Sequence, residues 1–281
     1  MPETVNAWQK KLAHDLAGIS ESAGLDGQVL LAHVTHRSRS WILAHPEFVL
    51  SEEQMKILQE AHRSLKAGMP LPYILGHWEF FGLDFVVTPD VLIPRPETEV
   101  LVEQALHWLE KRSGNQRVLE LGVGSGCISV SLAVQQPLLH VVAVDISPQA
   151  IAVAQINAQR HQVANRFQFV ISDLFSAIRG RYDLLCANLP YIPTSELENL
   201  PVAKHEPHLA LNGGWSGLDL IQRFLQSAPR VLAEKGLILA EIEASQGKAA
   251  LDLAMDGFPE AQVTMVQDYS GNDRVLRIES V

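Results

Sequence analysis

Apolar residues recur at every third or fourth position through much of the first 67 residues, a spacing typical of amphipathic helices. The first series covers residues 8–19. The second follows a turn at 24–26, whose Asp26 is a candidate helix cap. The third covers 55–65 and follows Ser51, a candidate N-cap. No strand pattern interrupts these series, so the pattern predicts several short helices.

Proline and glycine end the helical pattern at residues 68–72 (Gly-Met-Pro-Leu-Pro), because neither is favoured inside a helix. The next run, 78–87, is aromatic and β-branched with Gly82 near its middle, which is typical of a β-hairpin. We therefore expect a helical domain over residues 1–72 and a β-hairpin linker over 73–94.

From residue 95 to residue 281 the pattern alternates between strand-like and helix-like periods. The expected strands are 117–121, 141–145, 167–171, 182–187 and 236–242, and the expected helices are 97–111, 148–160 and 217–233. Such alternation predicts an α/β domain with a mostly parallel sheet and helices on both faces. Two close-set runs, 262–266 and 274–278, predict an antiparallel pair at one edge of the sheet.

The composition is that of a globular protein with a full core, with 47% hydrophobic and 19% charged residues. No apolar run reaches the ~18–20 residues that cross a bilayer, and the N-terminus lacks the segments of a signal peptide. Cys127 and Cys186 lie in apolar sequence and are expected to be buried free thiols. The eleven histidines show no metal-ligand spacing. We therefore expect a cytoplasmic protein without a bound metal.

The net charge of −10 is unevenly spread along the chain. Residues 1–75 carry seven basic and eight acidic side chains, so nearly all of the excess acid lies in the remainder. Proteins that hold a nucleic-acid backbone normally show a basic stripe. The charge thus disfavours direct nucleic-acid binding, although a local basic patch would be compatible with it.

A glycine-rich turn at 122–126 (Gly-Val-Gly-Ser-Gly) joins a buried strand to an apolar helix. Glycines let the backbone approach a ligand closely and aim helix N–H groups at it. The next strand ends about twenty residues later in Asp145, where a carboxylate binds ribose hydroxyls in nucleotide-binding folds. Taken singly, the turn and the acid have structural alternatives, a plain turn and a helix cap. Together they predict a nucleotide site.

The third glycine of the dinucleotide fingerprint is missing, because Cys127 occupies its position. The spacing of Glu120 and the three glycines instead resembles the first motif of S-adenosylmethionine-dependent methyltransferases. The resemblance implies that S-adenosyl-L-methionine binds, with S-adenosyl-L-homocysteine as product, to Gly122, Val123, Gly124, Ser125, Gly126 and Asp145. It also places Asp173 and Leu174 beside the adenine, as acceptor for its amine and as apolar contact. A helix cap is the alternative for Asp173.

The fourth strand ends in a tetrad, Asn188, Leu189, Pro190 and Tyr191. Asparagine offers an oxygen acceptor and two N–H donors, proline restrains the turn, and tyrosine offers a flat face. The carboxyl edge of a parallel sheet is where ligands bind. The tetrad resembles the Asn-Pro-Pro-Tyr of methyltransferases that modify planar nitrogens of adenine, guanine or amides. Such nitrogens are poor nucleophiles, so we expect catalysis by positioning and electrostatics, without a strong general base.

Further segments resemble the bacterial family of class I methyltransferases that modify the glutamine of peptide chain release factors. The most specific is 92–99 (Leu-Ile-Pro-Arg-Pro-Glu-Thr-Glu). The others are 72–76, 80–83, 124–128, 172–175, Glu206-Pro207, Ala210-Leu211 and Gly213-Gly214. The resemblance covers roughly residues 28–281. It implies a Rossmann-like methyltransferase domain over 95–281, with a mostly parallel seven-stranded sheet and an antiparallel edge hairpin, preceded by a small helical bundle.

The same resemblance implies that the Gly-Gly-Gln loop of a release factor enters the site. The glutamine amide would donate to the Asn188 side-chain oxygen and the Leu189 carbonyl, beside Pro190, with Tyr191 flanking the amide plane. Asn188 would also border the cofactor, and Asn188 and Tyr191 are the expected catalytic residues. Arg95 is expected either to lock the fold or to lie near the sulfonium and the substrate. The helical domain would help to recognise the release factor.

Three positions depart from the family pattern. Leu189 replaces the usual proline, which keeps the carbonyl but loosens the turn. Val123 replaces a small threonine, and Glu243 replaces a glycine, for which the sequence offers no physical account. Glu97 and Thr98 are expected only to start a helix.

Two other functions stay open on sequence alone. A nucleic-acid amino-methyltransferase acting on adenine or guanine would use the same tetrad within a basic channel. A non-enzymatic nucleotide-binding module that assists translation would bind the cofactor yet tolerate the loss of Asn188.

Overall fold

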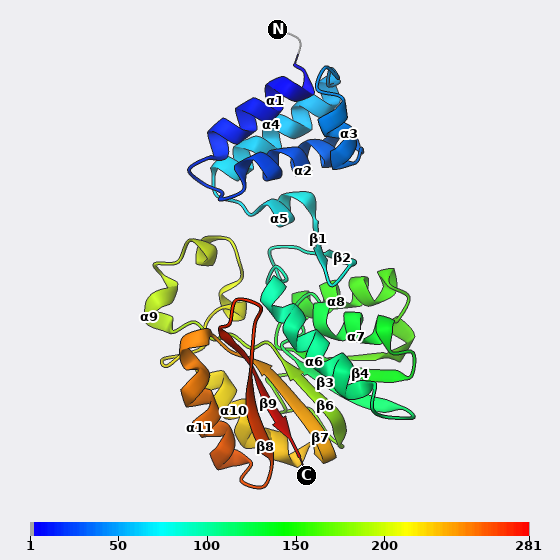
Figure 1. The fold of residues 1–281 in the computed structure, drawn as a ribbon, viewed down its shortest axis with the longest axis vertical. Coiled ribbons are helices and arrows are strands. Elements are labelled where there is room, and N and C mark those ends of the chain that lie inside the picture. Colours follow the sequence, from blue (N-terminus) through cyan, green and yellow to red (C-terminus); the bar gives the residue numbers. More distant parts are fainter. Residues whose placement is uncertain (1–2, 281) are drawn as a thin grey trace. The chain divides into compact units, whose positions relative to one another are not determined.

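The computed structural model describes residues 3–280, which divide into a helical unit ending at His77 and a larger α/β unit from Trp78 onward (Figure 1). The helical unit contains α1 (Val5–Leu16), α2 (Ala23–Thr35), α3 (Arg39–Ala44), α4 (Glu52–Lys66) and α5 (Leu71–Leu75). Leu12, Leu30 and Leu58 are fully buried in its core. The predicted N-terminal helices are therefore confirmed.

The helix limits confirm one sequence prediction and correct two. Ser51 caps α4 in a capping box with Gln54, as its sequence predicts. The predicted turn at 24–26 is wrong, because these residues lie inside α2. The Asp26 carboxylate accepts hydrogen bonds from the hydroxyls of Ser20 and Ser22. It also places negative charge in the first turn of the helix, where it is favourable. Ile19 follows the end of α1 and is 51% exposed, so it is not part of the buried stripe.

Strands β1 (His77–Phe80) and β2 (Leu83–Val86) form a two-stranded sheet over the run where a hairpin is expected. Asn157 of helix α8 (Pro148–Arg160) ties β2 to the rest of its unit. Its side chain accepts from the Val86 N–H (2.7 Å) and donates to the carbonyls of Val86 (2.9 Å) and Ser125 (2.8 Å). One fully buried amide thus connects the hairpin with the glycine-rich turn.

The α/β unit is built on a seven-stranded sheet of order β5-β4-β3-β6-β7-β9-β8 (Figure 1). The strands are β3 (Gln116–Leu121), β4 (Leu139–Asp145), β5 (Phe167–Ile171), β6 (Tyr182–Ala187), β7 (Leu232–Glu241), β8 (Gln262–Gln267) and β9 (Asp273–Glu279). The first five in spatial order are parallel, and β9 and β8 add antiparallel pairs at one edge. The predicted fold class is confirmed.

Alternate residues of each central strand face opposite helical layers, since side chains in a strand have a period of two. Helices α6 (Glu99–Leu109), α7 (Cys127–Gln135) and α8 cover one face, and α10 (Asp219–Ser227) and α11 (Gly247–Gly257) cover the other (Figure 1). The helix predicted over 217–233 is too long. It ends at Ser227, because Pro229 lies in the short turn that follows and β7 already begins at Leu232.

The strand order creates a crevice beside β3. The chain moves outward from β3 to β4 and β5, then returns to β6 on the other side of β3. Open α/β sheets bind ligands at such a switch point, outside the carboxyl ends of the strands. Leu121 of β3 is paired with Ala187 of β6, so the glycine-rich turn and the tetrad begin side by side.

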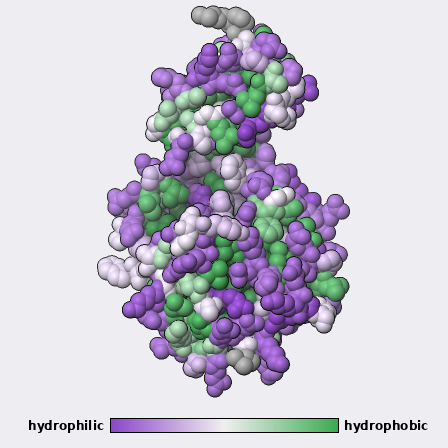
Figure 2. Space-filling model, viewed as in Figure 1, coloured by the Kyte–Doolittle hydropathy of each residue, from purple (hydrophilic) through white to green (hydrophobic). Residues whose placement is uncertain are grey.

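No helix among residues 3–280 is long and apolar enough to cross a membrane. The face drawn in Figure 2 is mostly hydrophilic, with hydrophobic side chains in small groups.

Candidate active site

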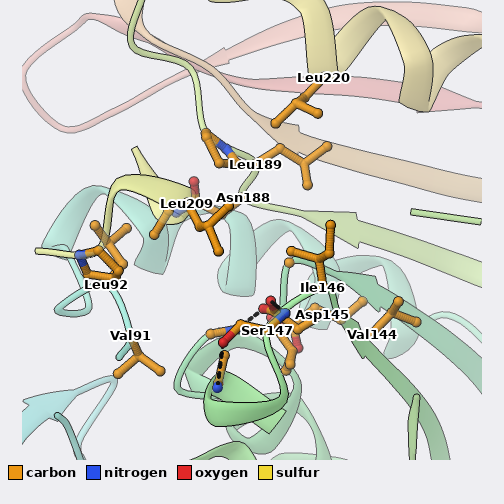
Figure 3. Close-up of a pocket in the computed structure, with 18 of the residues that line it drawn as sticks. Val91, Leu92, Val144, Asp145, Ile146, Ser147, Asn188, Leu189, Leu209 and Leu220 are labelled. Carbon is orange, nitrogen blue, oxygen red and sulfur yellow. Dashed lines mark hydrogen bonds between the residues drawn. The ribbon is translucent and has the colours of Figure 1, made fainter. Parts of the chain in front are cut away.

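A cavity of about 510 Å³ lies at the carboxyl ends of β3, β4, β5 and β6 (Figure 3). Asn188 and Leu189 lie across it from Asp145 and Ser147. This volume is typical of sites for cofactors and other small ligands. The residues expected from the sequence to form a site and found in its lining are Arg95, Gly122, Val123, Gly124, Ser125, Asp145, Asp173, Leu174, Asn188, Leu189 and Pro190.

Two expected site residues lie outside this lining. Tyr191 faces a smaller space of about 100 Å³, which it shares with Arg95 and Asn188. Gly126 is buried behind the turn, where an added Cβ would lie 3.3 Å from the Cβ of Ala154. Gly126 therefore permits close packing of the turn on α8 and does not itself line the cavity.

The glycine-rich turn has a backbone that only glycine adopts without strain. Gly122, Gly124 and Gly126 all have positive φ angles, of 71°, 52° and 80°. Helix α7 starts directly after the turn, so its first N–H groups lie beside the cavity. Cys127, predicted to be buried, is only partly buried and lines this cavity, whereas Cys186 is buried as predicted.

Asp145 holds the turn in place with both carboxylate oxygens. Oδ2 accepts from the Gly124 N–H (3.0 Å), and Oδ1 accepts from the Ser147 N–H (2.9 Å). Burial raises the pKa of Asp145, and these backbone donors oppose that rise. The cap of α8 is Ser147, whose hydroxyl accepts from Ala150, so Asp145 is not the helix cap. Its oxygens keep lone pairs for ligand hydroxyls.

A second carboxylate, Glu120, lies under the turn with 1% of its surface exposed. One oxygen accepts from the Ser129 N–H at 3.1 Å. Burial nevertheless raises the pKa of Glu120 to about 8.

We expect Glu120→Gln to stabilise the ligand-free protein more at pH 8.5 than at pH 5. The folded protein binds the Glu120 proton more tightly than the unfolded chain does, so stability falls as pH rises from about 4.5 to about 8. Glutamine does not titrate, so the difference between the two proteins should grow by up to about 4 kcal/mol across this window. Denaturant unfolding at several pH values measures it; parallel curves for the two proteins would contradict the assignment.

The part of the cavity that follows β5 is lined by an acidic side chain and by apolar side chains. The Arg223 guanidinium donates to Asp173 Oδ2 at 2.7 Å in a half-exposed ion pair, so Asp173 is not a simple helix cap. Leu174 has a φ of 45°, which is uncommon for a leucine and often marks a functional site. Ile146 is 53% exposed and lines the same cavity (Figure 3).

The tetrad is held from several sides. The Asn188 Nδ2 donates to the Thr98 hydroxyl at 3.1 Å. Leu189 is buried, and its Cδ2 would lie 3.2 Å from a Cβ added to Gly122. Burial raises the pKa of Tyr191, and the charge of Glu241 raises it further, so its hydroxyl stays protonated. Thr98 does lie at a helix start, as predicted, but it also positions the tetrad.

Arg95 forms a bridge between two of the expected motifs. Its guanidinium contacts the carboxylate of Glu206 at 2.5 Å, and Glu206 is almost fully buried. Burial raises the pKa of Glu206, and Arg95 opposes that rise. Arg95 therefore ties segment 92–99 to the loop after β6, and it lines both cavities.

Comparison with known proteins identifies both units. A family model described as the PrmC N-terminal domain matches residues 7–76, and a methyltransferase small domain matches residues 97–205. A release factor glutamine methyltransferase of Moorella thermoacetica is 41% identical over 260 residues, covering 92% of each chain. The Bacillus cereus protein of the same name is 37% identical, covering 90% of this chain and 91% of its own.

The chain belongs to the release factor glutamine methyltransferase family. Among solved structures, a 16S rRNA methyltransferase of T. thermophilus has a TM-score of 0.53 at 19% identity, covering 73% of this chain and 50% of its own. At this identity the likeness concerns the fold alone.

The Glu243 departure from the pattern of the release factor glutamine methyltransferase family now has a physical account. Glu243 caps a one-turn helix, Ala244–Gln246, by accepting from the Ser245 N–H at 2.7 Å. The Gln246 side chain at the end of that turn donates to the Tyr191 carbonyl at 2.8 Å. In this member of the family, Glu243 thus supports the tetrad through Gln246.

Proposed function

We propose that this protein methylates the side-chain amide nitrogen of the glutamine in the Gly-Gly-Gln motif of peptide chain release factors, using S-adenosyl-L-methionine. The observation that carries the proposal is the position of Asn188, a planar amide at the carboxyl end of β6, within one cavity with the turn after β3. Family membership agrees with it.

The residues of the cavity fit S-adenosyl-L-methionine. The glycine turn offers backbone N–H groups without side chains, Asp145 offers acceptors for ribose hydroxyls, and Leu174 offers an apolar surface for adenine. Asp173 would accept from the adenine amine while its carboxylate also accepts from Arg223. When bound, this cofactor supplies an electrophilic methyl group on a sulfonium.

The tetrad orients the substrate. Asn188 Oδ1 and the Leu189 carbonyl accept the two N–H bonds of the glutamine amide, which leaves the nitrogen lone pair directed away from them. Pro190 restrains the turn, and the Tyr191 ring flanks the amide plane. This positioning lets the glutamine amide nitrogen, a poor nucleophile, attack the methyl group. No side chain has to remove a proton from the amide first. Arg95 lies between both cavities, where it borders the incoming peptide.

The charge of the chain favours a protein substrate over a nucleic acid, and a protein substrate that works on the ribosome implies a cytoplasmic enzyme. The helical unit that ends at His77 is the proposed recognition domain for the release factor. Residues 3–280 contain no group of three or more side chains suited to hold a metal ion, and the proposed chemistry uses none.

One assay separates the three functions. Methyl-labelled cofactor is incubated with the protein and, in parallel, a release factor, the same factor with its loop glutamine changed to alanine, or a mixture of DNA and RNA. We expect label only in the unaltered release factor. Label confined to nucleic acid would favour the amino-methyltransferase, and cofactor binding without label in any sample would favour the binding module.

Exchange of Leu189 for the proline typical of the family should leave kcat within about threefold of the wild-type value. The proposed hydrogen bond uses the carbonyl of residue 189, which proline retains. The buried leucine side chain is lost, however, which should cost about 2 kcal/mol of stability. Steady-state kinetics and thermal unfolding of Leu189→Pro measure the two effects. A tenfold loss of kcat in the folded variant would show that the side chain, rather than the carbonyl, matters.

A further inference from the structure

Two large apolar side chains are exposed on the segment that returns to the tetrad after the loop that follows β6. Trp215 is 88% exposed and Leu209 is 67% exposed. Leu209 lines the cavity (Figure 3), and Trp215 directly follows Gly214, which lines it too. Together, Leu209 and Trp215 form what we call the apolar rim of the cavity. Single exposed apolar side chains are common on protein surfaces, so the way in which the fold holds these two determines what they mean.

The main chain of this segment is fastened to the residues that follow the tetrad. The Ile192 N–H donates to the Leu211 carbonyl at 3.0 Å, and the Ile192 carbonyl accepts from the Gly213 N–H at 2.8 Å. The Thr194 N–H donates to the Gly214 carbonyl at 2.9 Å. These three backbone hydrogen bonds fix the segment that carries the apolar rim beside the tetrad.

The loop around Trp215 packs so closely on Tyr191 that side chains would not fit beneath it. A Cβ added to Gly213 would lie 2.7 Å from the Tyr191 Cα, and one added to Gly217 would lie 2.5 Å from the Tyr191 carbonyl oxygen. The Trp215 N–H donates to Asp219 Oδ2 at 2.8 Å. The backbone of Trp215 is thus held on both sides, whereas its indole extends into solvent.

The proposed reaction requires a protein to cover this rim. Only the glutamine side chain enters the cavity, so the residues on either side of that glutamine remain at the mouth, where Leu209 and Trp215 are exposed. Tryptophan is common among the residues that contribute most to protein–protein binding, because it buries a large apolar area and has few rotatable bonds. A backbone that is already fixed reduces the entropy lost on binding.

An exposed tryptophan can also stack on a nucleic-acid base, but the charge around the rim disfavours this occupant. Residues 190–219 contain one basic side chain, Lys204, and four acidic ones. A groove that holds a nucleic-acid backbone is normally basic. A protein is therefore the occupant that this surface fits.

We propose that Leu209 and Trp215 form a docking rim that binds apolar side chains of the release factor next to its Gly-Gly-Gln loop. The inference rests on the proposed function, because that function supplies the occupant. Neither residue belongs to the tetrad or to the glycine-rich turn, so the rim acts on the affinity for the substrate protein and not on methyl transfer.

Substitutions of Trp215 test the larger side chain. We expect Trp215→Ala to raise the KM for the release factor at least ~10-fold, while kcat and the Kd for S-adenosyl-L-homocysteine change less than about twofold. Trp215→Phe keeps an aromatic surface and should stay within about threefold of the wild-type KM. The melting temperature should not change, because the indole is exposed. An unchanged KM in Trp215→Ala, or a loss confined to kcat, would overturn the proposal.

A matched pair of leucines tests the position of the rim. Leu138 is 58% exposed and directly precedes β4, so it lies at the edge of the sheet opposite to the cavity. We expect Leu209→Ala to raise the KM for the release factor at least ~3-fold and Leu138→Ala to leave it unchanged. Equal effects in the two variants would show that the loss has nothing to do with the rim.

One measurement does not depend on methyl transfer. The protein is labelled with 5-fluorotryptophan, and the ¹⁹F signal of Trp215 is assigned by its loss in Trp215→Phe. This signal should shift when unlabelled release factor is added with S-adenosyl-L-homocysteine, whereas the signal of the buried Trp108 should not. A mixture of DNA and RNA should leave both signals in place. A Trp215 signal that responds to nucleic acid alone, or to neither, would overturn the rim.

The outcomes separate the two proposals. If the wild-type protein methylates the release factor while Trp215→Ala keeps a normal KM, the docking rim is wrong and the proposed function stands. If the wild-type protein labels no release factor, the proposed function fails and the docking rim fails with it.

Discussion

Replacement of Asn188 by alanine is expected to lower kcat for the release-factor glutamine at least ~10²-fold, the scale of losing one preorganised polar group at a reacting centre. The alanine leaves the substrate amide with the Leu189 carbonyl as its only acceptor from the tetrad, so its nitrogen is no longer held in one orientation. Cofactor affinity should change much less, because the turn and Asp145 are untouched. Single-turnover methylation and cofactor calorimetry measure the two quantities.

A matched control is Asn165→Ala, which removes an exposed asparagine from the short turn before β5. Its kcat should equal that of the wild type. If Asn188→Ala retained normal turnover, the tetrad amide would have no part in the mechanism, and the binding-module function would gain support.

Asp145→Ala should raise the Kd for S-adenosyl-L-homocysteine at least ~30-fold. Hydrogen bonds to a charged acceptor are worth about 1.5–3 kcal/mol each, and the ribose loses its carboxylate acceptor. The same carboxylate holds the Gly124 and Ser147 N–H groups, so its removal also loosens the turn. Both effects act on binding, whereas kcat at saturating cofactor should fall less.

The control for Asp145 is Asp252→Ala, on the exposed side of α11, which should leave the Kd unchanged. Isothermal titration with the product cofactor compares the three proteins. A change below threefold in Asp145→Ala would show that the ribose is held elsewhere.

The sequence predicts the features that arise from local patterns. Strand positions follow from runs of apolar residues. The glycine turn and the tetrad each follow directly after a strand, and Asp145 is the last residue of one. Because parallel strands end at one edge of a sheet, the order of these motifs along the chain is enough to place them together. In the structure, the pairing of Leu121 with Ala187 brings the glycine turn and the tetrad next to each other.

Contacts between distant segments could not be predicted in the same way. Thr98 meets Asn188 across ninety positions of sequence, and Arg95 meets Glu206 across more than a hundred. Glu241 is the last residue of β7, so its place at the carboxyl edge of the sheet is visible in the strand pattern of the sequence. A buried charged residue at the end of an apolar strand is costly and usually has a role.

The sheet also sets what the site can accept. Strand β3, which leads into the glycine-rich turn, and strand β6, which leads into the tetrad, are directly paired. Neighbouring strands in a sheet are about 4.8 Å apart. Hydrogen bonds between the strands keep this spacing fixed, so the distance between the turn and the tetrad does not adjust to a shorter substrate side chain. Asparagine, one methylene shorter than glutamine, would therefore have to bring its own main chain deeper to reach Asn188. Under the proposed function, we therefore expect discrimination between these two amides to depend on the length of the side chain that carries them.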